Sequence, residues 1–195
     1  MNPDRNSLRR ELRQRRREIP AGRRIAAAES LAAQLLALPC MPTSGFIAGY
    51  WAMDGEIALH VFQLRLPPAL TYCLPVLDGD RLRFSPWRPG DALATNRYGI
   101  PEPDVTASPA LEAQAMSMVV LPLVGFDANG HRLGMGGGWY DRSFAFRNQS
   151  SAPPWLVGAA FATQQLDAVV AETWDVAVDA ICTERETLLI NGVPA

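Results

Sequence analysis

Short apolar runs alternate with segments of helical spacing along this chain, and this alternation restricts its possible folds more than any other feature. The apolar runs are bounded by turn residues, as buried strands are. They lie at 45–50, 71–77, 116–124, 155–161 and 176–182. Helical patterns occupy 5–18, 25–36, 56–65, about 138–147 and 165–171. Strands that alternate with helices build βαβ units, so we predict an α/β fold: a single three-layer α/β/α domain with a mostly parallel central sheet.

The predicted domain covers residues 1–195, with residues 1–38 as an N-terminal helical segment packed on it. The stretch 78–110 is rich in Pro, Gly and Asp. We expect a strand there at 81–85 and an extended turn at 98–103, which two prolines impose. With 195 residues, 48% of them hydrophobic, the chain can bury a sizeable core, which excludes disordered and fibrous proteins.

All 18 basic residues of the chain are arginines, because it contains no lysine. The absence of lysine excludes a Schiff base and the lysine of a Walker A loop. A phosphate site in this chain must therefore use arginine, backbone N–H groups, a helix N-terminus or a metal.

Nine of the arginines lie within residues 1–24 beside only three acidic residues, whereas the remainder of the chain is acidic. Arg5, Arg9, Arg13 and Arg16 form one stripe of the first predicted helix. Such a stripe is a solvated face, a ligand-facing surface or a polyanion-binding surface. Because the rest of the chain is acidic and has no nucleic-acid-binding motif, we expect no nucleic-acid partner.

The cysteines Cys40, Cys73 and Cys182 are far apart and lack CxxC spacing, so we expect buried apolar residues rather than disulfides or a zinc site. No apolar run approaches the roughly 20 residues that cross a bilayer. The arginine-rich beginning of the sequence cannot form the apolar core of a signal peptide. We therefore expect a cytoplasmic protein that is monomeric and has no membrane partner.

A glycine-rich loop follows the 116–124 run, with glycine at four of the five positions 134–138. Glycines let the backbone approach a ligand and turn N–H groups toward it, so this loop fits an anion. Arg132 could neutralise a phosphate, and Asp141 could hold Mg²⁺. The alternative is a flexible turn with a surface arginine and aspartate. The dinucleotide-binding pattern GxGxxG is excluded, because Trp139 stands where its last glycine would be.

Residues 132–142 read RLGMGGGWYDR and resemble the loop RLGxGxGYYDR of the 5-formyltetrahydrofolate cyclo-ligase family, also called 5,10-methenyltetrahydrofolate synthetases. The resemblance continues in order along nearly the whole chain. Arg5 with Leu8-Arg9-Arg10 is similar to the family's KxxLR(K/R) N-terminal helix. The other similar stretches are Gly49-Tyr50 with Glu56-Ile57, Leu74-Pro75-Val76, Tyr98 to Pro103, Val120-Leu121-Pro122, Gly158 to Phe161 with Gln164, and Glu172 to Val176 with Asp179.

This resemblance implies an ATP- and Mg²⁺-dependent enzyme. In the implied reaction, ATP phosphorylates the formyl oxygen of 5-formyltetrahydrofolate, N10 attacks the activated carbon, and phosphate leaves to give 5,10-methenyltetrahydrofolate. ADP and phosphate are the co-products, and the partners are the two small-molecule substrates. Transfer of a γ-phosphoryl group requires positive charge and in-line positioning more than a covalent nucleophile.

The resemblance also implies which residues form the site. The implied catalytic residues are Arg132 and Glu56. ATP would be bound by Arg5, Arg9, Arg132, Leu133, Gly134, Met135, Gly136, Gly137, Gly138, Trp139 and Tyr140. The folate would be bound by Trp51, Glu56, Met135, Gly136, Gly137, Gly138 and Trp139. Mg²⁺ would be held by Asp141 and Asp175.

The chain departs from the family pattern at several of these positions. Arg5 replaces the usual lysine, Trp139 replaces the first tyrosine of a Tyr-Tyr pair, and Trp174 replaces a histidine. Met135 and Gly137 stand where other members often carry basic residues. Two alternatives therefore remain: a catalytically silent relative that binds folate or nucleotide for regulation, and a polyanion-binding module built on residues 5–24.

Overall fold

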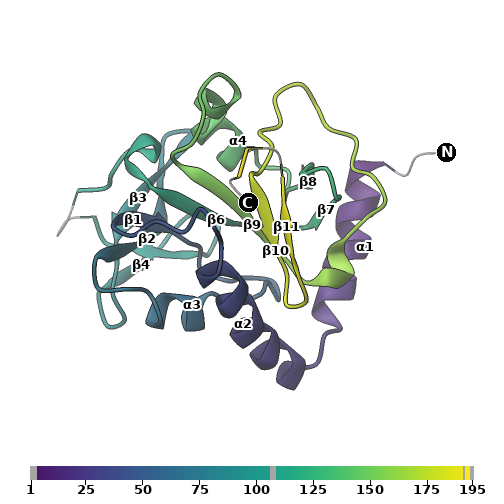
Figure 1. Ribbon diagram of the computed structural model, residues 1–195, viewed down its shortest axis with the longest axis horizontal. Helices are drawn as coiled ribbons and strands as arrows, with labels where there is room; N and C mark the ends of the chain where they lie inside the picture. The colour runs from purple at the N-terminus through teal and green to yellow at the C-terminus, as the bar shows by residue number, and fades with distance from the viewer. Residues whose placement is uncertain (1–3, 106–108, 191, 194–195) are drawn as a thin grey trace.

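The computed structural model describes residues 4–105, 109–190 and 192–193, so residues 106–108 of the Pro-rich stretch and the first three residues of the 1–38 segment lie outside it. Its centre is a seven-stranded sheet with the strand order β11-β10-β9-β6-β1-β2-β3 (Figure 1). Strands β10, β9, β6, β1 and β2 are parallel, and the edge strands β3 and β11 are antiparallel to their neighbours. The strands are β1 (Gly45–Ala48), β2 (Leu70–Asp78), β3 (Arg81–Pro86), β6 (Met118–Pro122), β9 (Trp155–Ala159), β10 (Ala180–Cys182) and β11 (Thr187–Leu189).

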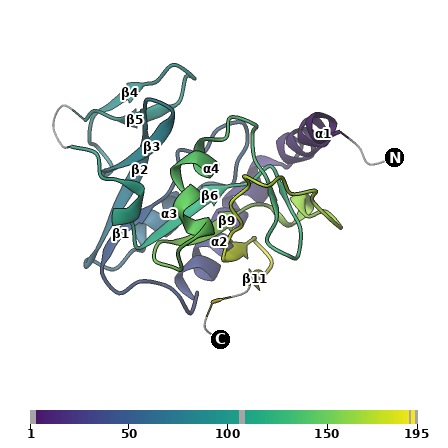
Figure 2. The ribbon, with the colours of Figure 1, turned by 90° about the horizontal axis from the view of Figure 1, so that it is seen from above.

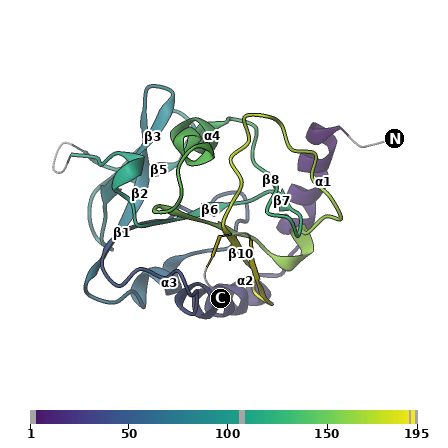
Figure 3. The same ribbon diagram turned by 45° about the horizontal axis from the view of Figure 1, so that its top comes forward.

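Helices cover both faces of the sheet, which confirms the predicted three-layer α/β architecture (Figure 3). Helices α2 (Ala21–Leu36) and α3 (His60–Leu64) pack on one face, where Leu31, Ile47 and Val120 share one core. Helix α4 (Trp139–Ser143) and the 3₁₀ helix η2 (Ala145–Asn148) pack on the other. The central strand β6 is buried on both faces, as its continuous apolar sequence predicts.

Helix α1 (Arg5–Arg17) stands at one end of the molecule, and the β4–β5 hairpin (Leu93–Thr95 and Pro101–Pro103) stands at the other, with α4 between them (Figure 2). Helix α1 buries Leu12 against Val124 and Leu133 of the β7–β8 region. The small hairpin β7–β8 (Gly125–Phe126 and Arg132–Leu133) leads directly into the glycine-rich loop. The docking of α1 therefore brings its arginines close to that loop.

The predicted helix at 165–171 is wrong, because the backbone there is used by tertiary contacts instead. The N–H of Leu166 donates to the carbonyl oxygen of Phe126 at 2.8 Å, and the N–H of Val169 donates to the buried carboxylate of Asp127 at 2.9 Å. Two other predicted helices are shorter than expected: 56–65 is helical only from His60, and 138–147 changes to a 3₁₀ helix after Ser143. The predicted extended turn at 98–103 contains a short strand, β5 (Pro101–Pro103). The antiparallel edge strand β11 was not predicted.

Cys40, Cys73 and Cys182 are free and buried, as predicted. Among the described residues, no helix has both the length and the apolar character that a membrane span requires.

Candidate functional site

A cavity of about 440 Å³ opens at the carboxyl ends of strands β1, β2 and β6. This edge is where open parallel sheets usually bind ligands, because the connecting loops converge there. Nearly all the site residues predicted from the sequence line this cavity. They are Arg5, Arg9, Trp51, Glu56, Arg132, Gly134, Met135, Gly136, Gly137, Gly138, Trp139, Tyr140, Asp141 and Asp175.

Leu133 is the one predicted site residue that does not line the cavity. Its side chain is buried against Leu12 of α1. Its carbonyl oxygen accepts a hydrogen bond from the N–H of Val124 at 2.9 Å. Leu133 therefore anchors the strand that precedes the glycine loop.

The glycine loop forms one wall of the cavity and is held by helix α1. Gly136 and Gly138 have φ angles of +96° and +66°, which side chains other than glycine rarely adopt. The Nε atom of Arg9 donates to the carbonyl oxygen of Gly134 at 2.8 Å. A Cβ atom added at Gly136 would lie 3.4 Å from Cζ of Arg9, so the helix and the loop approach closely.

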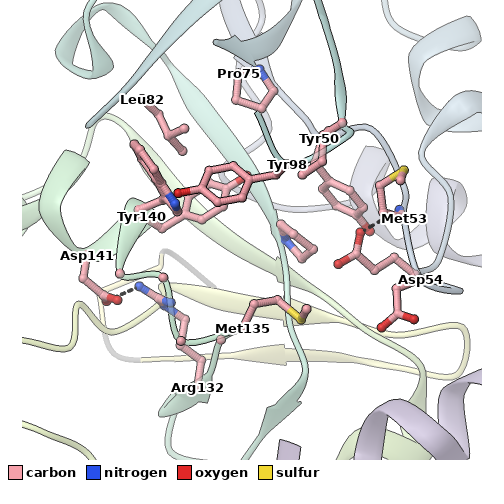
Figure 4. Close-up of a pocket in the computed structure, with 18 of the residues that line it drawn as sticks. Tyr50, Met53, Asp54, Pro75, Leu82, Tyr98, Arg132, Met135, Tyr140 and Asp141 are labelled. Carbon is pink, nitrogen blue, oxygen red and sulfur yellow. Dashed lines mark hydrogen bonds and ion pairs between the residues drawn. The ribbon is translucent and has the colours of Figure 1, made fainter. Parts of the chain in front are cut away.

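Arg132 and Asp141 form an ion pair at the same end of the cavity (Figure 4). Arg132 is buried, and its Nε atom donates to the carbonyl oxygen of Val176 at 3.0 Å. Asp141 also accepts from the N–H of Val176 at 3.2 Å. These contacts hold the guanidinium and the carboxylate in place in the cavity that the loop residues 134–138 also line.

Arg5 of α1 pairs with Asp175, which is distant in the sequence, and both Nη atoms of Arg5 lie 3.1 Å from one carboxylate oxygen of Asp175. Glu172 lies 3.7 Å from the same guanidinium. The Nε atom of Arg5 is buried without a hydrogen-bond partner in the described structure. Burial, and next the positive charge of Arg5, lower the pKa of Arg9 from its usual value. An anion that binds beside Arg9 would offset this unfavourable effect of Arg5 on the charge of Arg9.

Figure 4 shows Tyr50 and Met53 across the cavity from Arg132, and Glu56, which bonds to Met53, belongs to the same end as these two residues. One carboxylate oxygen of Glu56 accepts from the N–H of Met53 at 2.9 Å. Burial raises the pKa of Glu56 above its usual value, while the Met53 hydrogen bond and the charge of Arg16 oppose this rise. The carboxylate is therefore poorly solvated and available to donors on a ligand.

Aromatic side chains surround the space between the two ends. Trp51 meets Trp87 edge to face, with ring centroids 5.7 Å apart. Trp139 meets Tyr98 in the same way at 5.9 Å. The guanidinium of Arg97 lies 5.3 Å from the centre of the Trp139 ring. Flat apolar walls of this kind accommodate the faces of a conjugated ring system.

Sequence reasoning missed several residues that complete the cavity, among them Asn96, Tyr98 and Ile100 of the β4–β5 connection. Asn96 accepts from the N–H groups of Tyr98 and Ile100 and so shapes the turn that carries both residues into the lining. Tyr98 and Trp174 also line the cavity, although more than half of each side chain is exposed. The irregular Pro- and Gly-rich composition of 78–110 was the available signal for the Tyr98 turn.

The two predicted metal ligands provide carboxylate oxygens, which are the donors that Mg²⁺ prefers. Asp141 and Asp175 are each paired with an arginine. Within the described ranges, no three His, Cys, Asp or Glu side chains converge as a metal-binding group. This donor set fits Mg²⁺ that shares its coordination with phosphate oxygens and water, rather than a metal held by the protein alone.

Comparisons with known proteins agree with one another. The model of the 5-formyltetrahydrofolate cyclo-ligase family matches residues 1–184. A 5-formyltetrahydrofolate cyclo-ligase of Haemophilus influenzae is 34% identical over 88% of this chain and 93% of its own length. One from Escherichia coli K12 is 30% identical over 88% of this chain and 96% of its own. The NMR structure of the Aquifex aeolicus 5,10-methenyltetrahydrofolate synthetase, at 24% identity, covers 98% of this chain and 95% of its own with a TM-score of 0.82, so the folds agree.

Proposed function

The chain belongs to the 5-formyltetrahydrofolate cyclo-ligase family, and we propose that its cavity converts 5-formyltetrahydrofolate to 5,10-methenyltetrahydrofolate with ATP. The observation that carries this proposal is the division of one cavity into an end lined by arginines and the glycine loop and an end with the buried carboxylate of Glu56, with aromatic walls between them. A triphosphate and a reduced pterin have the complementary chemistry. Both must meet in one site, because the γ-phosphoryl group passes directly to the formyl oxygen.

At the end lined by arginines and the glycine loop, the backbone of 134–138 and the guanidiniums of Arg5, Arg9 and Arg132 would bind the triphosphate. Support comes from the buried, fixed position of Arg132 and from the positive charge of Arg5, which lowers the pKa of Arg9. Charge-assisted hydrogen bonds from arginine stabilise the negative charge that spreads over the transferred group. This step needs no covalent phosphate acceptor on the protein, since positioning and charge suffice.

At the end that holds Glu56, its carboxylate would accept hydrogen bonds from N–H groups of the pterin and orient the pterin between the aromatic walls. Support comes from the burial of Glu56 and from its fixed contact with the N–H of Met53. The formyl oxygen attacks the γ-phosphorus and ADP leaves. N10 then forms its bond to the activated carbon, and the C–O bond to phosphate breaks. N10 loses its proton to the medium, so the products are the methenyl compound, ADP and phosphate.

Asp141 and Asp175 would hold Mg²⁺ together with phosphate oxygens, and the bound ion would supply neutralisation of the triphosphate charge. Both carboxylates are paired with arginines at the cavity end that the phosphates would enter. An arginine that leaves a carboxylate when ATP binds can pair with phosphate instead.

The test is to mix the purified protein with 5-formyltetrahydrofolate, ATP and Mg²⁺ and to follow the absorbance of the methenyl product. We expect product only when ATP and Mg²⁺ are both present, with one ADP released for each product formed. Omission of Mg²⁺ and replacement of ATP by ADP are the controls. A folded protein that binds both ligands in calorimetry but forms no product is a silent relative, and this result would refute the proposed activity.

A further inference from the structure

Helix α1 contains a buried arginine that the proposed phosphate site does not use. Arg16 is 1% exposed, and its guanidinium is surrounded by protein acceptors. Its Nε atom donates to the carbonyl oxygen of Asp54 at 3.1 Å, and its Nη2 atom donates to the Asp54 carboxylate at 3.0 Å. An arginine is almost never fully buried unless its partners offset the loss of hydration. The Arg16–Asp54 contacts are therefore the reason for this burial.

Asp54 has an unusual backbone for the residue type. Its φ angle is +50°, and it is the only residue other than glycine with positive φ in the described ranges. Gly55 follows with φ of +76°, so two successive left-handed residues form a tight turn. Such a conformation at a non-glycine residue persists where its surroundings hold it. Here three arginines of α1 hold it, because Arg13 and Arg17 also pair with the Asp54 carboxylate.

The turn at Asp54 sets the position of Glu56. Within the turn, the Glu56 carboxylate accepts from the N–H of Met53, and the N–H of Glu56 donates to the Met53 carbonyl oxygen, both at 2.9 Å. The Nη1 atom of Arg16 lies 3.7 Å from the other carboxylate oxygen of Glu56. One guanidinium therefore contacts both the turn and the cavity carboxylate that the turn carries.

We infer that Arg16 and Asp54 are positioning residues for the folate end of the cavity, an inference that rests on the proposed function. Arg16 ties helix α1 to the 53–56 turn, and Asp54 keeps the turn in its left-handed form. Together they present the Glu56 carboxylate to the pterin in one orientation. Neither residue needs to touch ATP, since the contacts of Arg5, Arg9 and Arg132 at the other end do not involve this turn.

The same arrangement sets the charge state of Glu56. Burial raises its pKa, and the positive charge of Arg16 acts in the opposite direction, as does that of Arg13, whereas Asp54 raises it further. The groups that face Glu56 from the surrounding elements are Arg13 and Arg16 of α1, Asp54 of its own turn, Tyr50 after β1 and Tyr140 of α4. Loss of the Arg16 charge must raise the Glu56 pKa, and loss of the Asp54 charge must lower it.

The experiment compares Asp54→Asn and Arg16→Gln with wild type in KM for each substrate. Asn tolerates the left-handed conformation and keeps the shape, but it removes the charge that the arginines hold. We expect KM for 5-formyltetrahydrofolate to rise at least fivefold in both variants, with KM for ATP within twofold of wild type. The acid limb of kcat/KM for the folate should move to higher pH in Arg16→Gln and to lower pH in Asp54→Asn.

Arg15→Ala is the matched control, because it removes an arginine of the same helix whose partner, Glu11, is on the surface. It should leave both KM values unchanged. If Arg16→Gln does not fold, the KM values for both substrates are measured on Arg16→Lys and Asp54→Asn instead, and thermal unfolding is measured for each variant. Unchanged folate KM, or equal rises for both substrates, would overturn the inference while an active wild type leaves the proposed function intact. An inactive wild type would instead refute the proposed function.

Discussion

The Nε atom of Arg9 donates a hydrogen bond to the carbonyl oxygen of Gly134 at 2.8 Å, although 125 positions separate the two residues in the sequence. This contact joins the first helix to the glycine loop without any ligand between them. Because the carbonyl accepts from α1, the loop is held in shape before substrate arrives. A preformed loop loses less conformational entropy when it binds phosphate than a mobile one does.

Arg132→Ala should raise KM for ATP by about 10- to 100-fold, since loss of a charge-assisted contact to phosphate costs roughly 1.5–3 kcal/mol. The same change leaves Asp141 without its partner and so lowers thermal stability. Steady-state kinetics and thermal unfolding measure the two effects. Arg147→Ala is the matched control, because Arg147 is equally buried and pairs with Asp179 outside the cavity. If Arg147→Ala weakens ATP use as strongly, the effect of Arg132 is one of stability alone.

Gly136→Ala should raise KM for ATP at least tenfold. A Cβ atom at this position adds strain at φ of +96° and comes into contact with the Arg9 guanidinium that holds the loop. Gly90→Ala has the same backbone strain, with φ of +101°, but its Cβ atom would meet nothing within 4 Å. The two variants should therefore lose similar stability and differ in nucleotide kinetics. Equal ATP kinetics in both would contradict a role of the loop in binding ATP.

Glu56→Gln should impair use of the folate with little effect on KM for ATP, and it should stabilise the free protein at neutral pH. Burial raises the pKa of Glu56 in the folded state above its usual value of 4.5, so the folded protein binds its proton more tightly than the unfolded chain does. The contribution of Glu56 to stability is therefore favourable below pH 4.5 and is lost as pH rises through the higher folded pKa. Thermal unfolding from pH 4 to 8 checks this. A lower melting temperature of Glu56→Gln at pH 7 would contradict it.

Asp127→Asn should destabilise the protein by about 1–3 kcal/mol, because an amide cannot accept at both positions where the carboxylate does. Asp127 is fully buried and accepts from the N–H groups of Asn129, His131 and Val169. Burial alone would raise the pKa of Asp127, but these hydrogen bonds and that of the His131 ring lower it below 3.8. Its contribution is thus present above pH 3.8 and is lost as pH falls through the lower folded pKa.

Denaturant unfolding of wild type and Asp127→Asn at several pH values separates this effect from cavity chemistry. The difference in unfolding free energy should be constant near neutral pH and should shrink in acid. A difference that grows in acid would mean that the carboxylate is protonated in the folded protein.

The parallel core of the sheet could be predicted because its strands are continuous apolar runs with turn residues at their ends. The run at 116–124 became the buried strand β6 for this reason. The segment 165–171 could not be predicted, since its backbone N–H groups bond to Phe126 and Asp127, which lie about 40 positions earlier. Local helical spacing contains no information about such partners.

The sequence predicted which residues line the candidate cavity where local composition indicates a ligand, as in the glycine loop with Arg132. The partners of its charged groups were not predictable, because they are set by docking of distant elements. Arg16 lies on the same stripe of α1 as Arg5, Arg9 and Arg13, yet it is the one of these four that is fully buried. The turn at Asp54 that accounts for this burial has left-handed backbone at a residue whose type does not reveal it.

The pairing of Arg5 with Asp175 spans 170 positions of the sequence. Arg5 of helix α1 therefore gains this counterion only when the chain around Asp175 is also in place. Fragments that end ahead of Asp175 keep this basic helix and the glycine loop, but they lack the carboxylate that holds Arg5. Proteolysis that removes Asp175 should accordingly abolish nucleotide use, rather than leave a smaller protein with reduced activity.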